Sequence, residues 1–366
     1  MKNFIPGLTL FRISILLFIL TAFCHSILFA DVFIPEEIDS INIQLDQYID
    51  LADLEYDDHP YPGRTNIGHI IIPYLQINTA PVQLNAGGWY RHVYVQYDKD
   101  KSPERMYPYM NAVFYPWNDS EFIIGNYPNL MRYPNTIYNE FLFFEQRPVA
   151  SGLKLDIKKK TINAAAFLDW IKLDTEEHPE EFIAGLLLKH NFSEYFYYKF
   201  FDHYHHRGGQ LNKDTHPVKI EQDIVNSPAL GFTYKGFYAE AAYYLSSFSQ
   251  NRKASTYGHA GSGTIGYASG RFDLSYQCFY NHNYYHQDSH VFYLKRENIL
   301  NRIRLDYNIL SYKRIVDIMF TGNLYGIDPP GIDFRIFAKI NLNLISYISD
   351  ESEARTENLN NNPDSI

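Results

Sequence analysis

RIRLDYNI, residues 302–309, alternates polar and apolar side chains along its whole length. IDFRIFAKINLNL, residues 332–344, continues the same alternation further, and residues 316–324 show it between them. A period of two marks a β-strand whose two faces meet different surroundings. Soluble strands usually have about five or six residues, whereas strands that cross a membrane need about 9–11. These lengths favour an antiparallel transmembrane β-barrel.

Similar alternation recurs from residue 68 onward, with turn residues between the segments. Lys235-Gly236 and Ser269-Gly270 each join two alternating segments, and a two-residue turn with glycine in second position strongly indicates a hairpin. The candidate strands are 68–77, 83–97, 107–116, 120–127, 140–146, 149–158, 161–173, 181–191, 194–206, 229–235, 237–248, 261–268, 271–283, 289–296, 301–310, 313–325 and 332–347.

These candidates are odd in number, whereas single-chain bacterial barrels have an even number of strands. We therefore predict an all-β chain with one antiparallel transmembrane β-barrel of 14 or 16 strands. Its periplasmic turns should be short and its outer loops longer. The longer connections are predicted at residues 127–139, 207–228, 249–260 and 283–290.

The chain divides into four predicted regions. In residues 1–30, Lys2 and Arg12 precede an apolar run and Ala30 offers a cleavage site, as in a secretory signal peptide. Residues 31–63 hold ten acidic residues and no Lys or Arg, which predicts an acidic periplasmic lead-in or a plug segment. Residues 64–348 form the predicted outer-membrane barrel. Residues 349–366 have the composition of a disordered acidic tail.

Composition indicates the surroundings of the chain. The net charge of −10 is concentrated in the two acidic ends, and this balance argues against nucleic acid as a partner, because phosphate binding needs a basic surface. Aromatic residues make up 17% of the chain, which suits girdles at two membrane interfaces. The expected location is the outer membrane, and the expected partners are outer-membrane lipid and the outer-membrane assembly machinery.

Two groups of histidines stand out among the fourteen. On a strand, His203 and His205 share one face, predicted to point into the lumen or its rim, whereas Asp202 and His206 lie on the other face. The second group lies in a predicted outer loop and comprises His282, His286 and His290. Convergence of both groups on one ion remains an alternative, but ordinary polar rim residues explain them more simply. We therefore predict no metal site and no cofactor.

The sequence gives no local signature of catalysis. No G-x-S-x-G nucleophile motif occurs, and the glycine-rich segment 258–263 reads more simply as a tight loop or bulge. Carboxylate pairs such as Glu180-Glu181 are interpreted as solvated turn residues. We therefore predict no catalytic residues and no enzymatic activity.

Charged residues of both signs alternate with the apolar face of the predicted strands, as expected for a water-filled pore of modest selectivity. The predicted pore-lining residues are Lys154, Asp156, Lys158, Asp169, Glu240, Arg271, Asp273, Arg302, Arg304, Asp306, Asp317 and Lys339.

The alternating strands, export signal, aromatic content and amphipathic last strand resemble the porin-type outer-membrane β-barrels of Gram-negative bacteria. FEQRPVASG (144–152), LDW (168–170) and HRGGQ (206–210) are similar to segments of uncharacterised outer-membrane proteins of Bacteroidetes-type genomes. This resemblance implies a passive or weakly selective channel for small hydrophilic solutes. Two alternatives remain: a non-conducting barrel whose outer loops bind a glycan, metal or partner, and an outer-membrane hydrolase such as a lipase or lipid A deacylase.

Overall fold

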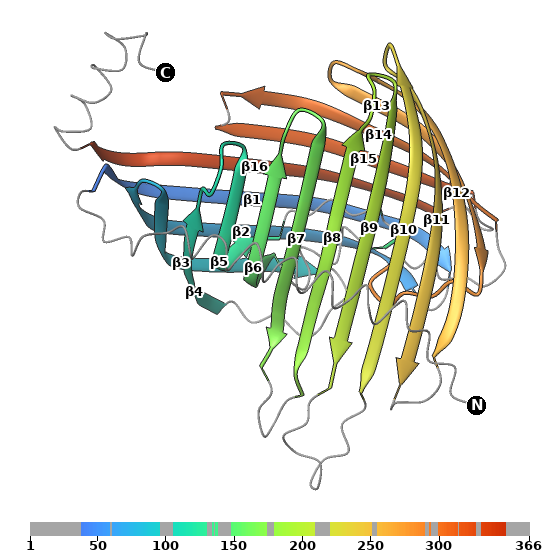
Figure 1. Ribbon diagram of the computed structural model, residues 1–366, viewed down its shortest axis with the longest axis horizontal. Helices are drawn as coiled ribbons and strands as arrows, with labels where there is room; N and C mark the ends of the chain where they lie inside the picture. Colours follow the sequence, from blue (N-terminus) through green and yellow to red (C-terminus); the bar gives the residue numbers. More distant parts are fainter. Residues whose placement is uncertain are drawn as a thin grey trace, which may run out of the picture.

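Sixteen antiparallel strands form one closed barrel in the computed structural model (Figure 1). The structure describes residues 38–58, 61–95, 105–129, 134, 136–137, 148–173, 179–208, 220–250, 255–289, 293, 299–313, 315–326 and 331–348. Each strand pairs with its neighbours in the chain, and β1 closes the sheet against β16. Closure gives every strand a neighbour on both sides, which is the condition for a sheet to cross a lipid bilayer. The expected all-β barrel is confirmed, with the larger of the two strand numbers.

The strands are β1 (Ser40–Asp58), β2 (Tyr61–Thr79), β3 (Val82–Val95), β4 (Arg105–Phe114), β5 (Ser120–Pro128), β6 (Val149–Lys158), β7 (Ile162–Lys172), β8 (Glu181–Asn191), β9 (Phe196–Arg207), β10 (Glu221–Tyr234), β11 (Phe237–Gln250), β12 (Thr256–Ser269), β13 (Phe272–His282), β14 (Ile299–Tyr312), β15 (Val316–Gly326) and β16 (Gly331–Ile348). Short turns join them at one end, and most of the connections at the other end are longer. No described helix is long and apolar enough to span a membrane.

The first strand lies where the sequence predicted a lead-in or plug segment. Residues 40–58 form β1 and pair along their length with both β2 and β16. From the local sequence alone, the acidic side chains of this segment are expected to be exposed to solvent. In the structure Asp50 is buried in an ion pair with Arg335 of β16, and Asp46 accepts a hydrogen bond from Tyr74. Residues 40–58 are therefore strand residues of the barrel wall, and Asp50 has its charged partner 285 residues away in the chain.

Two further strands begin earlier than predicted. β10 begins at Glu221 and β12 at Thr256, although the sequence placed both starts in long outer loops. In β10 the inward positions near the start are Asp223, Val225 and Ser227, so no apolar alternation marks them. The candidate strand at 140–146 lies outside the described residues. Only residues 289 and 293 of the candidate at 289–296 are described, and neither is in a strand.

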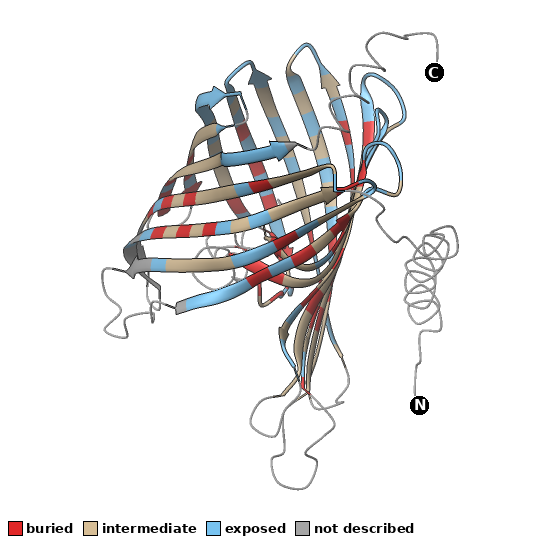
Figure 2. Cartoon of the chain, turned by 90° about the vertical axis from the view of Figure 1, so that its left-hand side faces the viewer, coloured by how far each residue is buried: buried red, intermediate tan, exposed pale blue. Residues whose placement is uncertain are grey.

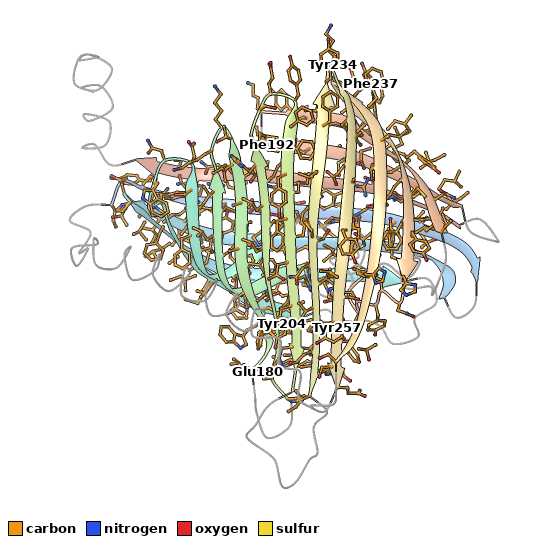
Figure 3. All side chains as sticks on the ribbon, turned by 45° about the vertical axis from the view of Figure 1, so that its right-hand side comes forward. Glu180, Phe192, Tyr204, Tyr234, Phe237 and Tyr257 are labelled. Carbon is orange, nitrogen blue, oxygen red and sulfur yellow. The ribbon has the colours of Figure 1, made fainter. Side chains whose placement is uncertain are left out.

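The outer surface of the barrel is apolar and ends in aromatic side chains. Leu230, Leu245 and Ile265 are exposed large apolar residues at mid-strand positions. Figure 3 shows Phe192, Tyr234 and Phe237 at the short-turn end, with Tyr204 and Tyr257 at the opposite end. Such an arrangement matches an apolar band between two aromatic girdles.

The inside of the barrel is packed near the end with the long connections. Figure 2 shows buried residues recurring along the strands between more exposed ones. One apolar cluster joins strand residues such as Val225, Tyr244 and Phe279 to Ile137 and Tyr284 from two connections. The described residues of the β13–β14 connection, 283–289 and 293, thus include side chains packed inside the barrel. Gly258 permits this packing, because a Cβ there would lie 1.9 Å from the backbone oxygen of Asn283.

Candidate functional site

The strand register places histidines and carboxylates on the inner wall near the outer end of the barrel. On β9, His203 and His205 point inward, and they lie opposite Val225 and Asp223 of β10. His206 belongs to the other face, where its ring lies 5.0 Å from that of Phe182. The predicted division of the β9 histidines between two faces is confirmed.

The β13–β14 connection adds two more groups to the same place. Its first residues are held by Asn281, whose side-chain oxygen accepts a hydrogen bond of 2.7 Å from the backbone N–H of Tyr284. Further along, the backbone N–H of Gln287 donates to Asp223 Oδ2 at 2.7 Å. These contacts bring His286 and Asp288 into the barrel beside β9 and β10.

Four side chains form the buried part of the site. His286 Nδ1 lies 3.0 Å from Asp223 Oδ1, and its Nε2 lies 3.9 Å from Asp288 Oδ2. His203 Nε2 lies 3.8 Å from the same Asp288 oxygen. The rings of His203 and His286 meet edge to face, with centroids 4.7 Å apart. His203, His286 and Asp223 are 0% exposed, so solvent does not reach them. We call these four residues the lumen cluster.

His205 and Glu181 form the more open side of the site. His205 lies between two carboxylates, with Nδ1 3.0 Å from Asp288 Oδ2 and Nε2 3.1 Å from Glu181 Oε1. The side chains of His205 and Glu181 are 10% and 14% exposed. Glu181 also pairs with Lys172 at 3.2 Å. A small molecule or water that enters from the long connections would therefore meet His205, Glu181 and the Asp288 carboxylate before the fully buried His203, His286 and Asp223.

Two residues of the β13–β14 connection, His286 and Asp288, have pKa values shifted from their ordinary ones. Burial alone would lower the pKa of His286, but the Asp223 carboxylate beside it raises that pKa above its ordinary value. Burial would likewise raise the pKa of the Asp288 carboxyl, yet the hydrogen bond from His205 and the surrounding imidazoles hold it below its usual range. Asp288 is therefore an ionised carboxylate at neutral pH, and can serve as a ligand or as an acceptor.

The predicted pore-lining residues occupy other parts of the inner wall, and most contact neighbouring groups. Their contacts are Lys154 with Asp156 (2.6 Å), Asp169 with the Ser151 N–H (2.9 Å), Glu240 with Lys199 (2.6 Å), Asp273 with the Tyr238 hydroxyl (2.7 Å), Arg302 over the Tyr293 ring (6.0 Å), Arg304 with Asp306 (2.8 Å) and Asp317 with the Ser311 hydroxyl (2.6 Å).

The remaining three lie at or near the short-turn end. Lys158 is the last residue of β6, Arg271 stands in the β12–β13 turn, and Lys339 of β16 lies opposite Asp317. None of the twelve belongs to the lumen cluster. Their role in lining a pore remains a prediction.

Sequence reasoning missed the carboxylates of the site. Glu181 was interpreted as a solvated turn residue, and Asp223 and Asp288 fell in predicted outer loops. The histidines gave the better signal, because His286 and His203 come from the two groups whose convergence had been left as an alternative. The other two histidines of the second group are not part of the site. His282 packs against His259 on the outer face of the barrel, with ring centroids 4.7 Å apart. His290 is not among the described residues.

A closed antiparallel barrel with an apolar, aromatic-rimmed exterior defines an outer-membrane β-barrel protein. Its interior holds a set of potential proton-transfer and metal-binding groups near the outer end. The sequence model of the family described as "Lipid A 3'-O-deacylase-type" matches residues 34–327, most of the chain. The chain belongs to this family.

Solved structures resemble the barrel at low similarity. The Pseudomonas aeruginosa protein OccK5 (OpdH) is 10% identical with a TM-score of 0.47, over 83% of this chain and 98% of its own. A loop-deletion mutant of OmpT, an outer-membrane protein of Vibrio cholerae, gives 10% and 0.47, over 83% and 100%. A BenF-like porin from Pseudomonas fluorescens Pf-5 gives 8% and 0.45, over 83% and 99%. No match was found among curated proteins.

The family assignment corrects one prediction from the sequence. The chain was expected not to be an enzyme, and this is wrong, because the family that matches is a family of deacylases. Lipid-facing alternation along the strands is shared by channels and membrane enzymes, so the pattern that identified the barrel could not separate them. The outer-membrane location and the barrel class stand as predicted.

Proposed function

We propose that the chain is an outer-membrane hydrolase that removes an ester-linked acyl chain from lipid A. The family match over residues 34–327 is the observation that carries this proposal. It also agrees with the position of the site, because the histidines and carboxylates lie toward the end with the long connections. Lipid A occupies the outer leaflet, so its acyl esters would lie at the same level of the membrane.

His205 and Glu181 are the residues that we propose to transfer protons. Ester hydrolysis requires a base that takes a proton from the attacking water and an acid that protonates the departing alcohol. Glu181 can serve as the base, and His205, held between Glu181 and Asp288, can carry a proton to the leaving oxygen. Both side chains retain some exposure, whereas His203 and His286 have none.

The packed interior supports a hydrolase over an open channel. Tyr244, Phe279, Tyr284 and Tyr293 pack together inside the barrel near its outer end. Water-filled pores of the porin type keep a polar channel through the lumen. The folded protein should therefore give no steady single-channel current in a planar bilayer.

Mass spectrometry of lipid A exposed to the folded, detergent-solubilised protein tests the proposal. The wild-type protein should release one fatty acid per lipid A and lower the lipid mass by that acyl chain. Glu181→Gln should lower the rate at least about 100-fold, as expected for loss of a general base. His206→Asn is the matched control, because it changes a histidine on the outer face of β9. An unchanged lipid mass with folded wild-type protein would overturn the proposal.

A further inference from the structure

We propose that the lumen cluster is a binding site for one divalent transition-metal ion, of which Zn²⁺ is the best fit. The ligands would be His203 Nε2, His286 Nε2 and an oxygen of Asp288. The inference goes beyond the proposed function, because the site would bind its ion whether or not the protein cleaves lipid A.

The donor set selects the class of ion. Imidazole nitrogen suits zinc, copper, iron and nickel, whereas calcium and magnesium take oxygen ligands. Two imidazoles and one carboxylate leave a further position for water in a four-coordinate site. One donor atom from each of the three residues lies within 4.8 Å of the other two, and the Nε2 atoms of His203 and His286 lie 3.8 and 3.9 Å from Asp288 Oδ2. A tetrahedral zinc site separates its N and O donors by about 3.3 Å, so small side-chain movements would complete it.

His286 is oriented as a ligand. A metal-bound histidine usually donates its second ring N–H to a carboxylate, which fixes the ring and leaves the other nitrogen for the metal. Asp223 occupies that carboxylate position, 3.0 Å from His286 Nδ1, and is itself fixed by the backbone N–H of Gln287. Both ring nitrogens of His286 are fully buried without a hydrogen bond of good geometry among the described residues; Nδ1 still has the Asp223 carboxylate 3.0 Å away, whereas the group nearest Nε2 is Asp288 Oδ2 at 3.9 Å. Leaving such a nitrogen unsatisfied is costly, and a metal ion would satisfy it.

Asp288 is held in a similar way. His205 Nδ1 lies 3.0 Å from Asp288 Oδ2, and Glu181 lies on the far side of His205. A carboxylate oxygen can accept this hydrogen bond and still bind an ion through its other lone pair. The ion would therefore join β9 to the β13–β14 connection and fix that connection inside the barrel.

The test uses the full-length folded barrel, freed of metal with a chelator and then titrated with Zn²⁺ or with Co²⁺ as an absorbing reporter. We expect one equivalent to bind tightly, Co²⁺ to show visible bands of a low-coordinate site, and the thermal unfolding midpoint to rise. His286→Ala and the nearly isosteric Asp288→Asn should abolish stoichiometric binding. Asp223→Asn should weaken it by about 10- to 100-fold, as expected for a residue that positions a ligand.

Two controls keep the outcome specific. His206→Ala and His282→Ala remove histidines of the outer surface and should leave binding unchanged. Circular dichroism and the heat-dependent shift in gel mobility establish that each variant is a folded barrel. Absence of tight binding by the wild-type barrel would overturn the proposal. Full binding by folded Asp288→Asn and His286→Ala would also overturn it. Both readouts are made without lipid, so they are independent of the deacylation assay.

Discussion

Two kinds of charged group line the inside of this barrel. Pairs such as Asp50–Arg335 and Lys199–Glu240 consist of opposite charges placed by strand register alone. The lumen cluster instead combines carboxylates with imidazoles and depends on a connection that enters the barrel. In each pair the two charges lie within ion-pair distance of each other, and Glu240 also accepts a hydrogen bond from the Tyr197 hydroxyl. In the cluster, His286 Nε2 is buried without a hydrogen-bond partner among the described residues, and two further donor groups lie beside it.

Removing one charge of a register-placed ion pair distinguishes these pairs most sharply from the lumen cluster. Asp50→Ala leaves Arg335 buried without its carboxylate, so the free energy of unfolding should fall by about 3–5 kcal/mol. Zinc binding should not change, because this pair lies on β1 and β16. Denaturant unfolding in detergent measures the first quantity and metal titration the second.

Asp317→Ala is the comparison variant. It removes an exposed hydrogen bond with Ser311, and should cost about 1 kcal/mol or less. If both variants lost the same free energy of unfolding, burial of the Asp50–Arg335 pair would add nothing to its contribution to stability.

A second variant acts on the connection instead of the charges. In Gly258→Ala the new methyl group would meet the backbone of Asn283 at the point where the β13–β14 connection enters. Overpacking of this kind costs about 1–3 kcal/mol. Since the strain falls where the connection docks, zinc affinity should decrease by about tenfold or more while the barrel still folds.

Gly263→Ala on the same strand gives the matched control, because nothing lies within 4 Å of its added Cβ. Its zinc affinity should equal that of the wild type. If Gly258→Ala bound zinc equally well, the docked position of the connection would have no part in the site.

The smallest expected effect concerns one hydrogen bond at the edge of the site. The backbone N–H of Tyr285 donates to the hydroxyl of Ser246 at 3.2 Å, and Ser246 is buried. Ser246→Ala should destabilise the docked connection by about 1 kcal/mol and weaken zinc binding by a few fold. Ser262→Ala removes a hydroxyl that contacts Tyr244 instead, and should leave zinc affinity unchanged. Equal affinities for both variants would contradict this ranking.

The difference between the two regions also explains what could be predicted from sequence. Alternation along residues 302–309 and 332–344 gave the barrel, because the side-chain period of a strand is a local property. The same rule correctly divided His203 and His205 from His206. It could not give the meeting of His286 with His203, which depends on a connection that folds back into the barrel.

The first strand was not predicted from the sequence, for a related reason. Asp46 and Asp50 looked like solvated charges because their partners lie on other strands: Tyr74 contacts Asp46 across the β1–β2 hairpin, and Arg335 meets Asp50 only where the barrel closes. The prediction of no enzymatic activity was wrong for a different reason, since the strand pattern is the same in a channel and in a membrane hydrolase.

The position of the bound ion tests the central claim most directly. Crystals of the zinc-loaded barrel should give an anomalous difference peak at the zinc absorption edge, about 2.0–2.1 Å from the Nε2 atoms of His203 and His286. The Asp288 carboxylate should supply the third protein ligand. A peak at the outer His259–His282 pair instead, or no peak inside the barrel, would contradict the account.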